Sequence, residues 1–466
     1  MKNSKLKDLF SSVWYGIGAI GLDLSYGMFY SYLSIYLTDI LHLKIGFLLL
    51  LAPLARIWDG FNDPIMGSIV DNTKTKFGKY RLWVVIGAVA NAVVLALLFT
   101  DFGLKGIPLY ILITVLYIGW GMTNTMADIP YWSMVPSFTS DPDKRSIIST
   151  VARTFSGLGQ GIILIGAPIL LPLLSKESTK ENPYDAQGFS RLALICGAFL
   201  IGFALLSMSK VKENNVTKPS EKFNFKKVLT IVRKNDQLLV FMLFAMLSNA
   251  GYYMISGVAA YYFKYVVEDT TKQSLFSAMG AVGAILGLLF LPIMMNFTSR
   301  RRTYQASLLI TIVSYVGMFV SGQILGNVIL LDIFYLTGSI GTGSMFVSQT
   351  VFLADIVDYG EVKLGYRAES ITFSMKGFLQ KMAYTIQVII LFAGLGSNYT
   401  LVAEGQADAS SVKGAINIMM LILPAVFFVL SLIVFTFKFK LHGELMEEIT
   451  AKVTENMKLR EQSEAE

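Results

Sequence analysis

The sequence lacks most of the residues on which disulfides, zinc sites and histidine catalysis depend. It has one cysteine and two histidines among 466 residues. Cys196 lies in an apolar stretch, and His42 and His442 lie far apart in segments between such stretches. We therefore expect no disulfide, no zinc centre and no catalytic histidine.

Charged residues and nucleotide-binding motifs are also scarce. Only 15% of the residues are charged, and the net charge of +7 comes from short segments between apolar runs rather than from a basic domain. This distribution does not indicate a protein that binds nucleic acid. The chain shows no glycine-rich phosphate-binding loop and no nucleophile beside a base, so we expect neither an enzyme nor a cofactor.

Long apolar runs are abundant instead, since 54% of the residues are hydrophobic. They predict an all-α membrane protein. The first run lacks the short core and the cleavage site of a signal peptide, so we expect it to be retained. About twelve transmembrane helices are expected, near residues 12–38, 45–70, 81–100, 107–136, 146–173, 190–208, 238–264, 273–297, 303–322, 327–354, 369–395 and 415–437.

A basic segment divides the chain into two parts. It runs from Lys210 to Asp236, holds eight Lys or Arg residues, and is interrupted by Asn214, Asn215 and Pro219. Six spans on either side predict the major facilitator fold, in which substrate binds between two six-helix bundles. The expected N-terminal bundle, cytosolic linker, C-terminal bundle and cytosolic tail are residues 1–209, 210–236, 237–438 and 439–466.

Most Lys and Arg residues outside the spans lie on the side of the two termini. The positive-inside rule then places both termini in the cytosol. We expect a multi-pass protein of the bacterial cytoplasmic membrane, surrounded by lipid and functional as a monomer. The tail after Lys438 is typical of a short polar helix and is too short for a regulatory domain.

Two acids inside an apolar run are the most informative feature. Asp59 and Asp63 stand one helical turn apart near the middle of the second predicted span, so they share a helix face. A carboxylate at mid-bilayer costs at least ~2.5 kcal/mol, and two close carboxylates need a cation, an Arg or a Lys to stay ionised. The pair therefore predicts a cation site.

Four stretches give the chain a family resemblance. They are ARIWDGFNDPIMGSIVDNTKTKFGKYRLW at 55–83, YGIGAIGLD ending at Asp23, WGMTNTMADIPYWSMVP at 120–136, and ADIVDYGEVKLGYRAES at 354–370. In order and spacing, the chain resembles the glycoside, pentoside and hexuronide cation symporters, the melibiose permease group of the major facilitator superfamily. The resemblance covers nearly the whole chain.

The resemblance implies a cation site of Asp59, Asn62, Asp63 and Thr125. Two carboxylates, an amide oxygen and a hydroxyl are the hard ligands that a small cation prefers, and the neutral oxygens favour sodium over a proton alone. The alternative is a polar cluster that only packs helices together. Lys381 matches the intramembrane lysine of the family and is expected to couple the two halves. Its alternative is snorkelling to the interface, which suits Lys376 better.

The resemblance also implies a sugar site. Asp23, Asp128 and Arg153 would bind hydroxyls, and Trp132 would offer a flat face to a pyranose ring. The alternatives are an interfacial tryptophan and a buried ion pair. The chain departs from the best-known members at three positions, which are Leu22 for a lysine, Asn124 for a tyrosine and Phe346 for a tryptophan. Asn124 and Phe346 occupy sugar-binding positions of the family, so we expect both to contact the sugar. The resemblance still implies symport, but it does not imply that melibiose is the substrate.

Charged residues near the helix ends are interpreted as gates that break as the halves move. The alternative is that basic loops are simply solvated. Asp332, in the tenth span, is equally consistent with a substrate contact and with a solvated acid. The predicted gate groups are Asp71 with Lys76, Lys79 and Arg81; Asp355 and Asp358 with Arg367; and Arg56 with Asp39.

The resulting hypothesis is a secondary active symporter that couples sodium or proton influx to uptake of a glycoside or oligosaccharide by alternating access. Two alternatives stay open: a lysophospholipid transporter of the same superfamily, and a transporter-like sugar sensor. Asp128, Trp132 and Arg153 argue against the first, and the short tail argues against the second. The sequence leaves open which sugar is carried and whether sodium, protons or lithium drive it.

Overall fold

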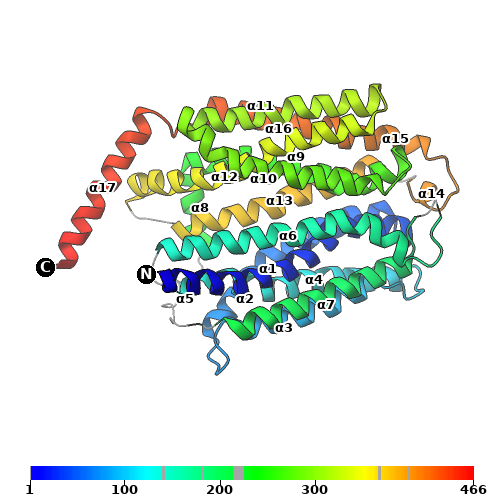
Figure 1. Cartoon of the computed structure of the whole chain (residues 1–466), viewed down its shortest axis with the longest axis horizontal. Coiled ribbons are helices and arrows are strands. Elements are labelled where there is room, and N and C mark those ends of the chain that lie inside the picture. The colour runs from blue at the N-terminus through cyan, green and yellow to red at the C-terminus, as the bar shows by residue number, and fades with distance from the viewer. Residues whose placement is uncertain are drawn as a thin grey trace. The chain divides into compact units, whose positions relative to one another are not determined.

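The computed structural model describes residues 2–138, 142–179, 183–211, 213, 225–365, 369–396 and 399–465. In these ranges every regular element is a helix, which confirms the all-α prediction (Figure 1). The chain separates into two compact units. Unit 1 comprises Met1–Phe223, Ala259–Ala278 and Phe392–Lys413, and unit 2 comprises Asn224–Val258, Met279–Leu391 and Gly414–Glu466.

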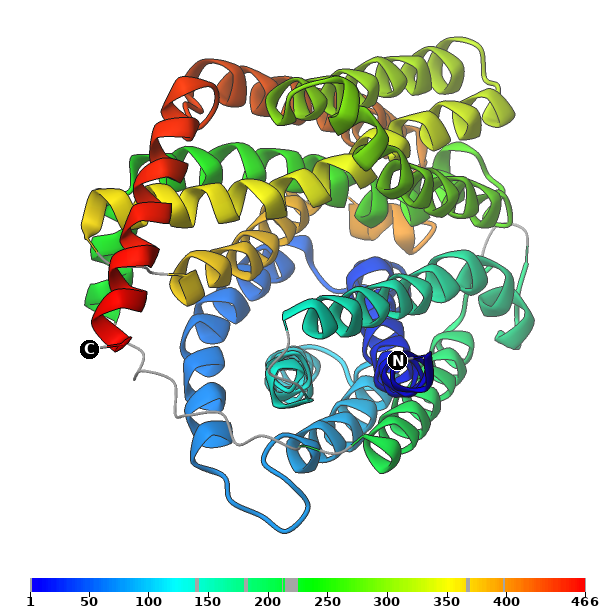
Figure 2. The ribbon, with the colours of Figure 1, turned by 60° about the vertical axis from the view of Figure 1, so that its left-hand side comes forward.

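Unit 1 is built mainly from the first half of the chain. Within it α1 packs against α6 and α7, α3 packs against α4 and α7, and α2 packs against α4. Figure 2, with the start of α1 facing the viewer, shows α1, α6 and α7 side by side. The elements are α1 (Lys2–Ile35), the π-helical turn η1 (Tyr36–Ile40), α2 (Ile45–Asn72), α3 (Arg81–Leu98), α4 (Ile107–Ser133), α5 (Val135–Phe138), α6 (Pro142–Leu174), α7 (Ala186–Lys210), the π-helical turn η2 (Tyr262–Val266) and α14 (Tyr399–Ala403).

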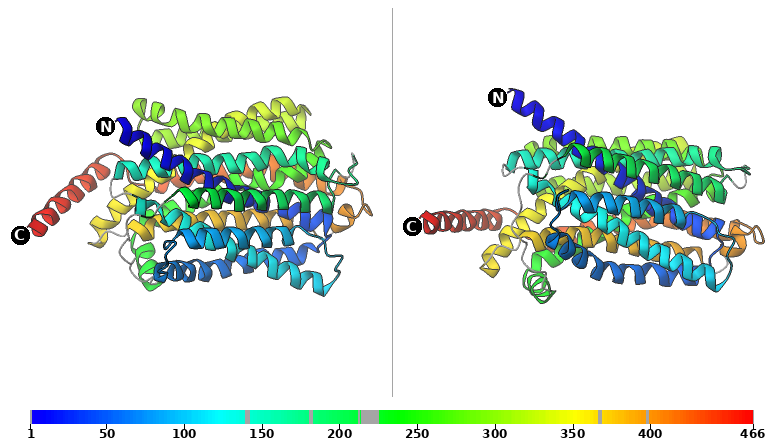
Figure 3. Two further views of the ribbon diagram at one scale, coloured as in Figure 1. Left: turned by 60° about the horizontal axis from the view of Figure 1, so that its bottom comes forward. Right: turned by 90° about the horizontal axis from the view of Figure 1, so that it is seen from below.

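Unit 2 holds most helices of the second half. α11 packs against α12 and α16, and α8 and α17 both contact α12. α17 extends away from the other helices of unit 2 (Figure 3). Helices α9, α10, α13 and α15 contribute residues to both units. The elements are α8 (Phe225–Lys234), α9 (Asp236–Tyr261), α10 (Lys272–Phe297), α11 (Arg300–Phe319), η3 (Val320–Ile324), α12 (Val328–Leu364), α13 (Glu369–Leu395), α15 (Ser410–Asn417), η4 (Ile418–Ile422), α16 (Leu423–Lys438) and α17 (Glu444–Ala465).

The helices have the length and composition of membrane spans. Among the described residues, 11 helical segments are long and apolar enough to cross a membrane. α1, which carries the first predicted span, adds a further helix of 34 residues. The predicted membrane architecture of twelve helices is therefore confirmed. The predicted division at 1–209, 210–236, 237–438 and 439–466 stays a prediction.

α2 shows how the sequence pattern orients a helix. Its large exposed side chains recur every three or four residues, which places them on one stripe. Such a stripe is stable in lipid rather than in water. The charged residues of α2 that are buried lie between the stripe positions and so face the other helices. The stripe consists of Leu50, Leu54, Ile57, Phe61 and Ile65, each 56% to 66% exposed.

α1 lies unusually close to its neighbours in unit 1. A Cβ at Gly21 would lie 2.9 Å from the Leu200 Cα in α7, and one at Gly159 in α6 would lie 2.5 Å from the Ile20 carbonyl oxygen. Small residues of this kind let helix backbones approach each other in membranes. The close approach brings side chains of α1 within reach of those on α6.

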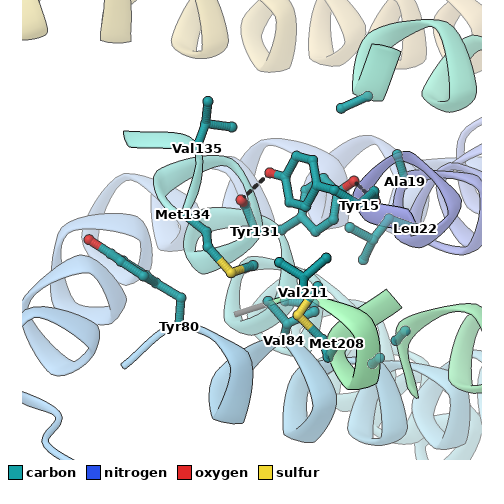
Figure 4. Close-up of a cluster of buried hydrophobic side chains, with 14 of the residues drawn as sticks. Tyr15, Ala19, Leu22, Tyr80, Val84, Tyr131, Met134, Val135, Met208 and Val211 are labelled. Atoms are coloured by element: carbon teal, nitrogen blue, oxygen red, sulfur yellow. Dashed lines mark hydrogen bonds between the residues drawn. The ribbon is translucent and has the colours of Figure 1, made fainter. Parts of the chain in front are cut away.

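A tyrosine pair joins α1 to α4 in the core of unit 1. The rings of Tyr15 and Tyr131 stack with centroids 4.4 Å apart. Each hydroxyl donates to the backbone carbonyl of the other residue, as Figure 4 shows for one of the two bonds. Both side chains are fully buried. The pair fixes the position of the C-terminal part of α4, where Asp128 and Trp132 lie.

Candidate functional site

The acid pair of α2 faces α4. Thr125 in α4 donates a hydrogen bond from Oγ1 to Asp63 Oδ1 at 3.0 Å. Asp59 lies beside Gly121, where an added Cβ would be 3.1 Å from Asp59 Oδ1. Asn62 is also buried, and its Nδ2 has no hydrogen-bond partner among the described residues. The structure thus brings Asp59, Asp63 and Thr125 together at the α2–α4 contact, and Asn62 is buried on the same helix as the two acids.

Asp59 is partly compensated by an arginine on its own helix. Arg56 Nη1 lies 2.7 Å from Asp59 Oδ2, and the two side chains are 7% and 8% exposed. The predicted pair of Arg56 with Asp39 is therefore wrong. Arg56 precedes Asp59 by three residues, a spacing that puts both on one helix face, so the sequence already held this signal. Asp39 instead pairs with Lys264, which lies on η2.

The predicted sugar-binding residues come together from α1, α4 and α6. Trp132 Nε1 donates to Asp128 Oδ1 at 2.9 Å, and the Arg153 guanidinium carbon lies 3.6 Å from the centroid of the Trp132 ring. Ser156, Asp128 and Arg153 are the polar and charged neighbours of Asp23. The site therefore offers two carboxylates, a guanidinium and an aromatic face within one small region.

One face of α4 serves both groups of residues. Gly121, Thr125, Asp128 and Trp132 follow one another at intervals of four, three and four positions, which is the repeat of a single helical face. Gly121 and Thr125 contact the acid pair, and Asp128 and Trp132 belong to the sugar group. Asn124, which was also predicted to bind sugar, is buried on the same helix.

A buried hydrogen-bond network holds α4 in place, and the sequence reasoning missed it. Ser25 donates to Asn91 Oδ1 at 2.6 Å, and Asn91 Nδ2 donates to the Trp120 carbonyl at 3.2 Å and to Thr123 Oγ1 at 3.1 Å. Asn91 is the only amide in the apolar third span, which is the signal that could have found it. The network ties α4 to α1 and α3 just before Thr125.

Unit 2 carries three further residues that the sequence analysis singled out. Lys381 is partly buried on α13, and its carbonyl accepts a hydrogen bond from Thr385. Phe346 packs edge to face against Tyr252, with centroids 5.0 Å apart. Asp332 is 2% exposed, and its Oδ1 has no partner among the described residues. The solvated interpretation of Asp332 is therefore wrong.

The loop before α3 contacts an acid that was not predicted. The backbone N–H groups of Lys79, Tyr80 and Arg81 donate to the Glu213 carboxylate at 2.8 to 3.0 Å. Glu213 comes from the linker and accepts from the N-terminal end of α3, where helix N–H groups lack partners within the helix. Lys76 is exposed, and the side chain of Asp71 lies outside the described residues.

The second predicted gate also has a partner that the sequence reasoning missed. Asp355 on α12 accepts from Arg300 Nη1 on α11 at 3.0 Å. Arg367, its predicted partner, lies outside the described residues, and Asp358 has interactions of its own. Arg300 opens the basic run that follows the eighth span, so charge alone could have suggested it.

Comparison with known proteins gives a family and a fold. A family described as MFS/sugar transport protein matches residues 14–443. The lactose permease of Lactobacillus helveticus is 28% identical over 98% of this chain and 74% of its own length. The isoprimeverose transporter of Lactiplantibacillus pentosus is 29% identical over 80% of this chain and 77% of its own. The crystal structure of a bacterial homologue of the human lysosomal transporter Spinster shares the fold, with a TM-score of 0.65, 14% identity, and coverage of 93% and 96% of the two chains.

Proposed function

The chain belongs to the MFS/sugar transport protein family, and from that premise we propose that it couples inward movement of sodium, or of a proton, to uptake of a glycoside or oligosaccharide by alternating access. The resemblance to the glycoside, pentoside and hexuronide symporters is confirmed, and the chain is a transporter of sugar rather than an enzyme. The coupling ion and the transport cycle belong to the proposal.

The shared face of α4 is the observation that carries coupling. Thr125, which bonds Asp63, is only three residues from Asp128, which bonds Trp132. A shift of α4 that improves one contact therefore moves the other. Binding at two sites on one rigid helix gives a coupling free energy, and linkage requires sugar to raise cation affinity as much as the cation raises sugar affinity.

Charge balance supports a cation at the acid pair. Asp59 and Asp63 together carry two negative charges when ionised, and Arg56 supplies one positive charge at 2.7 Å from Asp59. Arg56 thus balances one of the two carboxylates, and a bound monovalent cation would add a second positive charge. The Thr125 hydroxyl and the Asn62 amide supply neutral oxygens of the kind that bind sodium, whereas a proton would need only a carboxylate. We therefore favour sodium.

The Arg153 group supports a sugar as the cargo. The guanidinium lies over the indole of Trp132, while the two carboxylates of Asp23 and Asp128 lie close by. Carboxylates accept from sugar hydroxyls, a guanidinium donates to them, and an aromatic ring packs on the apolar face of a pyranose. The relatives are named for lactose and isoprimeverose, so we propose a glycoside as the substrate.

The test is counterflow of labelled galactosides, glucosides, xylosides and glucuronides in proteoliposomes of the purified protein, with and without sodium. We expect sodium to stimulate flux of one sugar class, and Asp59→Asn to abolish that stimulation. Asp101→Asn, in the exposed loop after α3, is the matched control and should behave as wild type.

Each other outcome removes part of the proposal. Flux that is independent of sodium and of pH would refute a coupled symporter. Stimulation by a proton gradient alone would assign the coupling ion to the proton. Sugar binding without net flux would indicate a sensor, and flux of a lysophospholipid but of no sugar would indicate the lipid transporter.

A further inference from the structure

Three helix ends of unit 2 meet at one surface. Arg301, in the first turn of α11, donates from Nη2 to the Thr436 carbonyl near the end of α16 at 2.5 Å, and Gln305 Nε2 donates to the Thr436 hydroxyl at 2.9 Å. The backbone N–H of Lys440 donates to Gln237 Oε1, in the first turn of α9, at 2.8 Å. The start of α9, the start of α11 and the end of α16 therefore lie side by side.

Six basic side chains gather at this surface, and α8 brings two of them because it ends just before α9 begins. One of the six is partly buried by its bond to α16, and the other five are exposed. None of the five exposed side chains forms an ion pair within the part of the chain that the structure describes. The six residues, which we call the basic cluster, are Arg233 and Lys234 of α8, Arg301 and Arg302 of α11, and Lys438 and Lys440 at the end of α16.

Two acids of this end of unit 2 have cations of their own. Asp236 pairs with Lys363, and Asp355 pairs with Arg300 at 3.0 Å. The next acids along the chain, from Glu444 onward, lie on α17, which extends away from the other helices of unit 2 (Figure 3). The positive charge of the basic cluster is therefore available to a partner outside the chain.

Two exposed phenylalanines flank the basic cluster. Phe297, at the end of α10, is 83% exposed and comes four positions before Arg301. Phe437 is 76% exposed and directly precedes Lys438. Among the described residues these are the two most exposed large hydrophobic side chains. Apolar side chains beside Lys and Arg are typical of a surface at the boundary between lipid headgroups and acyl chains.

The chemistry of this surface suits an anionic phospholipid. A guanidinium forms paired hydrogen bonds with a phosphate, and an ammonium binds a phosphate as a point charge. Lys and Arg near a membrane are attracted to lipids of net negative charge, whereas a zwitterionic headgroup has no net charge. The exposed phenylalanines add an apolar contact, which acyl chains satisfy and a free phosphate ion does not.

We propose that the basic cluster, together with Phe297 and Phe437, is a binding surface for anionic phospholipids. The phosphates lie against the arginines and lysines, and the phenylalanine rings insert among the acyl chains. This contact fixes the depth of unit 2 in the membrane at the end where α9 and α11 begin. It involves neither the sugar nor the coupling ion, so it goes beyond the proposed function and does not depend on it.

The test compares the lipids at two positions of unit 2. A fluorescent label is attached to the purified full chain at Asn296→Cys, an exposed residue beside Phe297, after Cys196→Ser has removed the one native cysteine. A second protein carries the label at Ile329→Cys, which is 69% exposed in the first turn of α12. α11 runs from the basic cluster to η3, and α12 begins after it, so Ile329 lies at the other end of unit 2 and is the matched control.

Quenching of the label by brominated lipid measures which lipid lies beside it. The bilayers contain phosphatidylglycerol and phosphatidylcholine in equal amounts, with bromine on the chains of one lipid or of the other. At Asn296→Cys we expect a preference of about fivefold for phosphatidylglycerol in low salt, and a smaller preference in high salt. At Ile329→Cys we expect no preference.

Charge variants identify the residues responsible. Arg302→Gln with Lys438→Gln removes two exposed charges that have no ion pair among the described residues, so the fold should survive and the preference should fall close to one. Lys44→Gln with Lys105→Gln removes the same net charge from exposed positions of unit 1 and should leave the preference unchanged. The thermal midpoint of each protein is measured alongside, and either single variant, with a smaller fall, serves if the double variant fails to fold.

The other outcomes would overturn the proposal. Equal quenching by the two lipids at Asn296→Cys, or the same preference at Ile329→Cys, would refute a localised lipid surface. A preference that survives the loss of Arg302 and Lys438 would refute the role of the basic cluster. A preference that inorganic phosphate abolishes, while chloride at the same ionic strength does not, would indicate a site for free phosphate instead of lipid.

Discussion

Removing one member of the Arg56–Asp59 pair should destabilise this protein more than removing both. The two side chains lie 2.7 Å apart and are 7% and 8% exposed, so neither charge has much contact with solvent. Breaking a buried pair by removing one partner typically costs about 3–5 kcal/mol, because the other charge stays buried without compensation. Asp59→Asn leaves Arg56 in that condition, and Arg56→Gln takes from Asp59 the guanidinium that lies 2.7 Å from it.

The double variant Arg56→Gln with Asp59→Asn should recover most of this loss. Asp101→Asn, in the exposed loop after α3, serves as the comparison. Its expected cost is within about 0.5 kcal/mol, the range for surface substitutions. Arg56→Gln also removes one positive charge from beside the two carboxylates, so sodium should raise its stability more than that of wild type.

The assay is thermal unfolding of the purified variants in detergent, followed by intrinsic fluorescence, with sodium or with an impermeant organic cation. We expect the double variant to unfold at a higher temperature than either single variant, and the sodium-dependent rise to be largest for Arg56→Gln. Additive destabilisation in the double variant would refute the idea that the pair acts as a unit. An equal sodium effect in wild type and Arg56→Gln would refute the charge balance of the site.

Three further predictions use other features of unit 1. Gly121→Ala and Gly119→Ala should each gain about 0.5–1 kcal/mol of helix stability. The methyl group added at Gly121 would lie 3.1 Å from a carboxylate oxygen of Asp59, whereas the one added at Gly119 would lie 3.7 Å from an aliphatic carbon of Val94. Only Gly121→Ala should therefore raise the sodium concentration for half-maximal uptake, by about threefold to tenfold, the equivalent of an off-rotamer side chain. Glu213→Gln should lower the thermal midpoint, because it weakens the hydrogen bonds between Glu213 and the start of α3. Glu448→Gln is the control and should leave the midpoint unchanged, since Glu448 is exposed and pairs with Lys452 one turn along the same helix. Arg153→Lys keeps the positive charge but loses the planar group that lies 3.6 Å over an indole ring, so sugar affinity measured by fluorescence titration should fall at least tenfold while sodium dependence persists.

Local patterns in the sequence account for much of the architecture. Apolar runs predicted the helices, and the spacing of Asp59 and Asp63 placed both acids on one face of α2. That face was determined by the chain itself, since exposed apolar residues recur along α2 at helical intervals and leave the acids on the other side. The Arg56–Asp59 pair is also a local feature, because both residues lie within one turn of the same helix. We nevertheless predicted the wrong partner for Arg56.

What only the tertiary structure decided is which distant groups meet. Asp39 and Lys264 are 225 positions apart, and nothing in their local sequence distinguishes this pairing from many others. Glu213 likewise reaches the start of α3 from a linker more than 130 residues away. Helix formation depends on hydrogen bonds and side chains within a few residues, so it can be predicted from sequence. Charge pairing between helices depends on how closely backbones pack, which is set at contacts such as Gly21 and Gly159 and emerges only when the whole bundle has formed.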